Sequence, residues 1–264
     1  MLSYQHAYHA GNMADVQKHA LLAVMLDYLG RKDKPFSYIE THAGRGLYDL
    51  GSAEAAKTGE AAAGIDLAEA KGWFPPDHPY ARVLAAVRRD HGERAYPGSP
   101  LVAAHLLRPD DRATVCELHP QEYEALLAAM LPWPVACRKA DGMDLALALT
   151  PPEPRRGLML IDPSWEVKAD YETIPRRIAA IHRKWNVGTI ALWYPILTDG
   201  RHRPMTTALA AMNFPKVLQH EMRFPPARDG HGMVGSGMFI LNTPFGSEAE
   251  AARMDRLMAG SGKR

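Results

Sequence analysis

Cysteine is scarce in this sequence, with 2 among its 264 residues. Cys116 and Cys137 have no CxxC partner, which excludes a disulfide framework and a zinc knuckle. The 12 histidines lack the HExxH and HxE…CxxC spacings, so the sequence also excludes zinc hydrolases and zinc deaminases. We therefore expect a protein that works without a bound metal.

Long apolar runs and a strong net charge are missing as well. No segment approaches the roughly 20 apolar residues that a membrane helix needs, and residues 1–4 do not begin a secretory signal. The net charge of +1 gives no global footprint for nucleic acid, so RNA binding would depend on local basic groups. We expect a cytoplasmic protein, independent of membranes, with one large α/β domain or two small ones.

The most informative segment is Leu158–Trp165, which reads Leu-Met-Leu-Ile-Asp-Pro-Ser-Trp. A short apolar run that ends at Asp162 predicts a strand buried in a parallel sheet. Ligands of such sheets bind beyond the carboxyl ends of the strands, which is where Asp162 would lie. A simpler interpretation is that Asp162 caps the next helix or binds a metal.

Asp-Pro-Ser-Trp differs by one residue from Asp-Pro-Pro-Tyr/Phe/Trp, the catalytic tetrapeptide of amino-directed methyltransferases. An exocyclic amino group is a poor nucleophile because its lone pair is delocalised into the base. Asp162 and the carbonyl of Pro163 would accept its two N–H bonds and aim the lone pair at a methyl donor. Trp165 offers a face on which a flipped base can stack. Ser164 replaces the second proline, which we expect to cost rigidity rather than function.

Strand patterns alternate with helical patterns, which predicts a doubly wound, mostly parallel sheet. One amphipathic helix begins at the N-cap Asn12 and ends at Gly30, and further helical patterns cover Gln121–Met130 and Tyr171–Trp185. The expected strands are Phe36–Glu40, Ala113–Glu117, Val135–Lys139, Leu158–Asp162, Thr189–Tyr194, Met238–Asn242 and, more weakly, Lys216–Glu221.

The segment 47–96 interrupts this alternation, because it contains alanine-rich helical sequence and no strand pattern. About fifty residues are far too many for a simple connection between a strand and a helix. We predict an inserted helical subdomain at 47–96. Residues 1–46, with a tail, a helix, the first strand and its glycine loop, would then join residues 97–264 in the sheet domain.

The first strand leads into a loop, Glu40–Gly46, in which Gly44 and Gly46 permit a tight turn. Asp49 replaces the third glycine of a dinucleotide fingerprint, and GxxxxGK[ST] is absent, so NAD fits badly and a P-loop is excluded. The loop fits the acidic-x-x-x-Gly-x-Gly pattern of S-adenosylmethionine sites, although a plain tight turn would look the same.

Carboxylates at three later strand ends favour the cofactor interpretation. Glu117 could accept both ribose hydroxyls, Asp141-Gly142 could meet an adenine edge, and Asp162 would follow them. Each of these residues alone is more typical of a helix cap or a turn. Their succession, in the order that a methyltransferase needs, is hard to explain by capping.

The sequence resembles a known family, the 23S ribosomal RNA (adenine-N6)-methyltransferases called ribosomal large subunit methyltransferase J, from Met1 to about Pro244. The resemblance is carried by Met1-Leu2-Ser3-Tyr4-x-His6, His9-Ala10-Gly11-Asn12, Ala14-Asp15-Val16, Lys18-His19, Thr41-His42-Ala43-Gly44-x-Gly46, Tyr96-Pro97-Gly98-Ser99-Pro100, Glu117-Leu118-His119-Pro120, Ala140-Asp141-Gly142 and Ala191-Leu192-Trp193-Tyr194-Pro195.

The resemblance implies a Rossmann-like class I methyltransferase fold, mostly parallel, with an inserted small helical subdomain and S-adenosyl-L-methionine as cofactor. It also implies that Asp162 is the catalytic acceptor and that Tyr4 contacts the RNA. The cofactor site would be lined by His19, His42, Ser99, Glu117, Asp141, Gly142 and Asp162.

Candidate RNA contacts are Lys18 and several paired basic residues, which could also be solvated faces. The glycine-rich segment Arg223–Gly237 would be a mobile loop near the bound base or an ordinary hairpin connection. The expected partner is 23S rRNA, protein-free or in an early assembly intermediate, and the expected state is a monomer. The alternatives are a DNA adenine-N6 methyltransferase, a glutamine methyltransferase, which Asp162 in place of asparagine disfavours, and a non-catalytic RNA-binding module.

Overall fold

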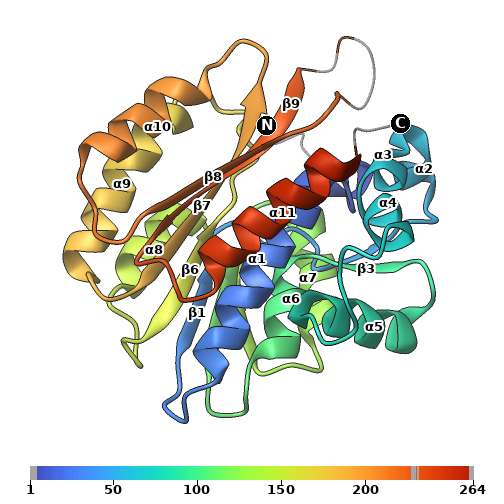
Figure 1. Cartoon of the computed structure of the whole chain (residues 1–264). Helices are drawn as coiled ribbons and strands as arrows, with labels where there is room; N and C mark the ends of the chain where they lie inside the picture. Colours follow the sequence, from blue (N-terminus) through green and yellow to red (C-terminus); the bar gives the residue numbers. More distant parts are fainter. Residues whose placement is uncertain (1–4, 227–229, 231, 262–264) are drawn as a thin grey trace.

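The computed structural model describes residues 5–226, 230 and 232–261. Its centre is a seven-stranded sheet with the strand order β5-β4-β1-β6-β7-β9-β8 (Figure 1). Neighbouring strands pair in parallel from β5 to β7, whereas β9 runs antiparallel to both β7 and β8. The strands are β1 (Ser37–Glu40), β4 (Arg112–Cys116), β5 (Val135–Arg138), β6 (Gly157–Ile161), β7 (Thr189–Leu197), β8 (Leu218–Arg223) and β9 (Met233–Leu241).

Every strand expected in this sheet forms, and the predicted α/β fold is confirmed. Strand β6 is fully buried, and this burial explains its unbroken apolar sequence. Leu158 and Leu160 belong to one hydrophobic core, and Met159 and Ile161 to a second core. Successive side chains of a strand point to opposite faces, so a strand that is covered on both faces has no polar positions.

Helices cover both faces of the sheet (Figure 1). The core that contains Leu158 lies beneath α1, α6, α7 and α11, and the core that contains Met159 lies beneath α8, α9 and α10. These helices are α1 (Met13–Gly30), α6 (Ser99–Leu106), α7 (Pro120–Met130), α8 (Gly142–Leu149), α9 (Asp170–Lys184), α10 (His202–Ala211) and α11 (Ser247–Ser261). The sequence patterns did not identify α11.

Helix α1 has the predicted bounds, but the prediction that it is amphipathic is wrong. It is buried on nearly all sides, since α5, α6 and α11 pack around it and the sheet lies beneath. The N-cap prediction holds, because the Asn12 side chain accepts a hydrogen bond from the Asp15 amide at 2.9 Å. The polar residues Asp15, Gln17, Lys18 and His19 are consequently buried, which is costly unless each has a partner.

The segment between β1 and α6 contains short α-helices flanked by two short strands. The prediction of no strand between Leu47 and Tyr96 is therefore wrong. Strands β2 (Leu47–Asp49) and β3 (Ala95–Pro97) pair antiparallel, with Tyr48 opposite Tyr96. This pairing brings the two ends of the segment together. Between them lie α2 (Ala53–Thr58), α3 (Glu60–Ala63), α4 (Ile65–Ala70) and α5 (Pro79–His91). The division of the chain into domains at 47 and 97 stays a prediction.

The connection between β8 and β9 is shorter than the expected loop Arg223–Gly237, because β9 begins at Met233. Gly237 is a strand residue, and a Cβ atom there would lie 2.3 Å from the ring of Tyr194. Its glycine therefore reflects close packing rather than mobility. Arg228 and His231 lie outside the described residues. A single turn, η1 (His6–Tyr8), precedes α1, and none of the helices in the described part of the chain could cross a membrane.

Candidate active site

A cavity of about 650 Å³ opens at the carboxyl ends of β1, β4 and β6, beside α1. Nearly all the residues predicted for cofactor and substrate line it, although they come from distant parts of the sequence. These are Lys18, His19, His42, Ser99, Glu117, Asp141, Gly142, Asp162 and Trp165. Tyr4 lies outside the described residues. The structure thus brings the predicted set together, while the role of each member stays a prediction.

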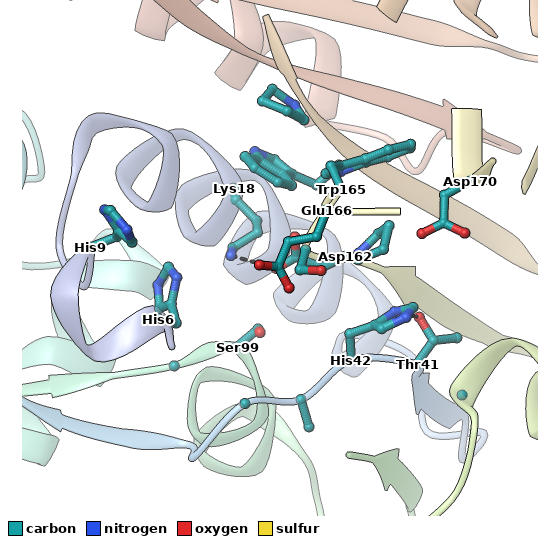
Figure 2. Close-up of a pocket in the computed structure, with 18 of the residues that line it drawn as sticks. His6, His9, Lys18, Thr41, His42, Ser99, Asp162, Trp165, Glu166 and Asp170 are labelled. Carbon is teal, nitrogen blue, oxygen red and sulfur yellow. Dashed lines mark hydrogen bonds and ion pairs between the residues drawn. The ribbon is translucent and has the colours of Figure 1, made fainter. Parts of the chain in front are cut away.

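Asp162 follows β6 directly and is bound by a lysine from α1 (Figure 2). The ammonium of Lys18 lies 2.6 Å from Oδ2 of Asp162 and 3.1 Å from Oδ1 of Asp15. Burial favours a neutral amine, but the two carboxylates outweigh it and raise the pKa of Lys18. The ammonium also lies 5.6 Å from the centre of the Trp193 ring. Lys18 therefore stays charged and faces the cavity rather than the outer surface.

Asp15 anchors this lysine and is itself almost fully buried. Its Oδ2 accepts a hydrogen bond from the Gly11 amide at 2.9 Å and lies 2.8 Å from Nε2 of His6. Burial alone would raise the pKa of Asp15, but His6 and Lys18 hold it well below its ordinary value. Asp15 belongs to the motif Ala14-Asp15-Val16 but was not among the site residues predicted from the sequence. The spacing Asp15, Lys18, His19 was the available signal, because i, i+3 and i+4 share one helix face.

The glycine loop contacts the acidic end of β4. Gly44 and Gly46 have φ angles of +60° and +76°, which favour glycine. The amide of Gly44 donates to Oε2 of Glu117 at 2.8 Å, and the amide of His119 donates to Oε1 at 2.7 Å. Burial raises the pKa of Glu117 despite these bonds. Each carboxylate oxygen keeps a second lone pair, so Glu117 can still accept hydroxyl groups of a ligand.

His42 and Gly142 also line the cavity. Nδ1 of His42 lies 2.7 Å from Oγ1 of Thr41, and burial lowers the pKa of His42 to about 4, so the ring is neutral. A Cβ atom on Gly142 would lie 1.8 Å from the carbonyl oxygen of Thr41, which only glycine avoids. Asp141 caps α8 by accepting the Asp144 amide at 3.0 Å. Capping and ligand binding are compatible, because the second carboxylate oxygen remains.

Glu40, which the sequence identifies only as the acidic start of the glycine loop, contacts Ser99, a residue that lines the cavity. Glu40 is fully buried at the end of β1. Ser99 donates to its Oε1 at 2.5 Å and Tyr38 to its Oε2 at 2.8 Å. Burial raises the pKa of Glu40 to about 8, and the nearby charge of Asp162 adds to the effect. The serine that lines the cavity is therefore held from behind by an acid.

Comparison with known proteins identifies the family. A family model described as Ribosomal RNA large subunit methyltransferase D, RlmJ, matches residues 33–260. The protein called Ribosomal RNA large subunit methyltransferase J from Escherichia coli (strain K12) is 41% identical over 256 residues, 95% of this chain and 90% of that protein. Its namesake from Haemophilus influenzae is 39% identical over 257 residues, again 95% of this chain and 90% of the relative. This chain belongs to the ribosomal RNA large subunit methyltransferase J family.

A solved structure agrees with this membership. The crystal structure of protein LPL1258 from Legionella pneumophila superimposes with a TM-score of 0.82 at 34% identity, covering 95% of this chain and 93% of that one. The resemblance noted in the motifs is confirmed, and it extends past Pro244, since the family match includes most of α11.

Trp165 departs from the simple picture of a free stacking platform in this family member. Its side chain is 6% exposed, and its ring packs on Tyr171 with the ring centres 4.5 Å apart. Its φ angle of +59° is unusual for a bulky residue. The sequence could not reveal Tyr171 as a neighbour. A base that stacks on Trp165 would have to use the part of the ring that Tyr171 leaves uncovered.

At least one member of each candidate basic pair has a partner within the protein; the pairs are Arg88-Arg89, Arg155-Arg156, Arg176-Arg177 and Arg183-Lys184. Arg88 pairs with Glu69 and Arg177 with Asp144, and Arg156 donates to the carbonyl of Lys34 at 2.7 Å. Such exposed pairs contribute little to stability, but they reduce the charge that is free for phosphate. Among the described residues, no group of three metal-binding side chains could hold a metal ion.

Proposed function

We propose that this protein transfers a methyl group from S-adenosyl-L-methionine to the exocyclic N6 of an adenine in 23S rRNA. One observation carries the proposal: Asp162, at the end of β6, faces the same cavity as the Gly44 turn and Glu117. The acceptor carboxylate and the cofactor groups therefore share one space. Family membership supports the ribosomal RNA as substrate.

The residues present fit the cofactor. The cavity of about 650 Å³ lies within the usual range for small-molecule sites. Glu117 would accept the ribose hydroxyls, and half-exposed Leu118 offers an apolar surface beside it. His42 and Gly142 line the same cavity, and a larger residue than Gly142 would clash with the backbone of Thr41. When bound, the cofactor supplies an electrophilic methyl group.

Asp162 has one oxygen available for the acceptor amine. Lys18 occupies Oδ2 at 2.6 Å, which fixes the carboxylate and leaves Oδ1 to accept an N–H bond. The carbonyl of Pro163 would accept the other N–H. Both contacts hold the nitrogen closer to tetrahedral and direct its lone pair at the methyl group. As the new N–C bond forms, the methyl group would leave the cofactor's sulfur, which keeps the electron pair of the broken bond, and the nitrogen would release one of its two protons to water through Oδ1 of Asp162.

The RNA side of the proposal rests on access. The base must leave its stack to reach Asp162, which is easiest in loops and helix ends of protein-free RNA or an early assembly intermediate. Tyr4 and the exposed part of Trp165 would contact the nucleotide. We also propose that the enzyme acts in the cytoplasm, which a ribosomal substrate supports, and that it acts as a monomer.

The deciding experiment treats protein-free 23S rRNA, assembled subunits and DNA with enzyme and cofactor, and then analyses the nucleosides by mass spectrometry. We expect N6-methyladenosine in protein-free rRNA and less in assembled subunits. Asp162→Ala should lower the rate by roughly a hundredfold or more, because a group that aligns the reacting nitrogen is lost. Methylation confined to DNA would favour a DNA enzyme, and cofactor binding without methylation would favour a binding module.

A further inference from the structure

A chain of buried hydroxyl groups connects the segment between β2 and β3 with the cavity. Oη of Tyr80, on α5, lies 2.8 Å from Oη of Tyr96, on β3. Oη of Tyr96 lies 3.1 Å from Nδ1 of His19, on α1. All three side chains are almost completely buried, and His19 lines the cavity. Burial raises the pKa of both tyrosines, so both hydroxyl groups keep their protons.

His19 carries only one ring proton, because burial lowers its pKa to about 3. The proton is on Nδ1 or on Nε2, and the hydrogen bonds of the two tyrosines favour one of these tautomers. If Nδ1 donated to Tyr96, the Tyr80–Tyr96 hydrogen bond could use only one of the two hydroxyl protons. The other hydroxyl proton would have no acceptor, because the described part of the chain offers these two hydroxyl groups no further partner. The opposite direction, from Tyr80 to Tyr96 to Nδ1, uses both hydroxyl protons and places the ring proton on Nε2.

Asp15 favours the same form independently. Nε2 of His19 lies 4.0 Å from Oδ1 of Asp15, whose carboxylate is held ionised by His6 and Lys18. A bare nitrogen lone pair would face this negative charge, whereas an N–H group presents its positive end. The separation is longer than a hydrogen bond, so the interaction is electrostatic. In the described part of the chain, Nε2 has no hydrogen-bond partner.

We infer that Tyr80 and Tyr96 are positioning residues that fix His19 as the Nε2–H tautomer beside Asp15. Asp15 holds Lys18, and Lys18 holds Asp162, so the helical segment supports the acceptor carboxylate through this series of contacts. The catalytic consequence rests on the proposed methyl transfer, whereas the tautomer itself does not.

The test is ¹⁵N NMR of histidine-labelled protein, with His19 assigned by comparison with His19→Gln. In the wild type, His19 should carry its proton on Nε2, in excess of the other tautomer by at least about tenfold, and the spectrum should stay constant from pH 6 to pH 8. Tyr96→Phe removes the donor to Nδ1. Tyr80→Phe removes the hydroxyl group that directs the Tyr96 proton toward Nδ1. Both variants should show a smaller excess of the Nε2–H tautomer than the wild type, because Asp15 alone then favours it. Tyr28→Phe, on the half-buried outer part of α1, is the matched control and should match the wild type.

Rate measurements connect the tautomer with catalysis. Tyr80→Phe should lower kcat for methyl transfer about threefold to tenfold and leave KM for the RNA unchanged. A proton on Nδ1 in the wild type, or an unaltered His19 signal in Tyr96→Phe, would overturn the inference. If the wild type bound S-adenosylhomocysteine but methylated no RNA, the proposed function would fail while the tautomer assignment would stand. If Tyr80→Phe did not fold, the wild-type spectrum and Tyr96→Phe would still decide.

Discussion

At the residue scale, the site depends on which polar atoms are already engaged. Oδ2 of Asp162 belongs to Lys18, and both oxygens of Glu117 accept backbone amides. The acceptor capacity that remains is Oδ1 of Asp162 and the second lone pairs of the Glu117 carboxylate, which lines the same cavity. A rigid set of partly used acceptors is well suited to catalysis, because nothing has to reorganise when a ligand arrives.

Glu117 should control cofactor affinity. Glu117→Ala removes the proposed acceptor of two ribose hydroxyls, and each charge-assisted hydrogen bond contributes about 1.5–3 kcal/mol. Affinity for S-adenosylmethionine should fall at least about tenfold by calorimetry. The amides of Gly44 and His119 also lose their partner, so circular dichroism must show that the fold survives. Unchanged affinity in a folded variant would refute the role of this residue.

Ser164 should tolerate the proline that the related tetrapeptide carries. Ser164→Pro narrows the backbone freedom of the loop after Asp162, which reduces the entropy of the unfolded chain. We expect the methyl-transfer rate to be preserved or raised and the melting temperature to stay the same or rise slightly. A large loss of rate with normal cofactor binding would show that the hydroxyl group of Ser164 has its own function.

At the element scale, α11 joins two parts of the molecule. The guanidinium of Arg253 binds Glu250 at 2.6 Å and also donates to the carbonyl of Trp73, while Glu250 lies 3.3 Å from Nε2 of His78. Trp73 and His78 belong to the segment between β2 and β3. The C-terminal helix therefore holds this segment against α1 and the sheet (Figure 1).

Acid should weaken this junction. Burial opposes the charge of Glu250, but hydrogen bonds from Arg253 and His78 lower its pKa to about 2 from an ordinary 4.5. A carboxyl group with a lowered pKa stabilises the fold above pH 4.5, and this stabilisation is lost as the pH falls toward 2. Glu250→Gln should lower the melting temperature by roughly 5 °C at pH 7. The difference from the wild type should shrink between pH 4.5 and pH 2; a constant difference would contradict the assignment.

At the scale of the whole molecule, short-range patterns predicted the fold well. The apolar run that ends at Ile161 and the glycine turn at Gly44 reflect local requirements of a buried strand and a tight turn, so sequence alone reveals them. Contacts between distant residues were not accessible. Nothing local to Trp165 indicates Tyr171 against its ring, and nothing local to Lys18 indicates Asp162, 144 positions later.

The helical pattern of α1 was misread for the same reason. Its apolar residues predicted a one-sided surface helix, but its polar residues are buried as well, because each has a partner supplied by tertiary structure. The signal that could have corrected the interpretation was the number of charged side chains on a helix that is otherwise strongly apolar. Such charges stay inside a protein only when they are paired.

The position of β1 in the sheet has a consequence for folding during synthesis. β1 pairs with β4 on one side and with β6 on the other, and both partners follow it by more than seventy residues of chain. A nascent chain that ends at Leu106 has made Lys18, His19 and the glycine loop but has no neighbour for its first strand. We expect N-terminal fragments of increasing length to remain sensitive to protease until they include Ile161. Protection of a fragment that ends at Leu106 would contradict this order. Asp162, the proposed acceptor, follows one residue later and thus joins the chain when the central strand β1 can first be enclosed on both sides.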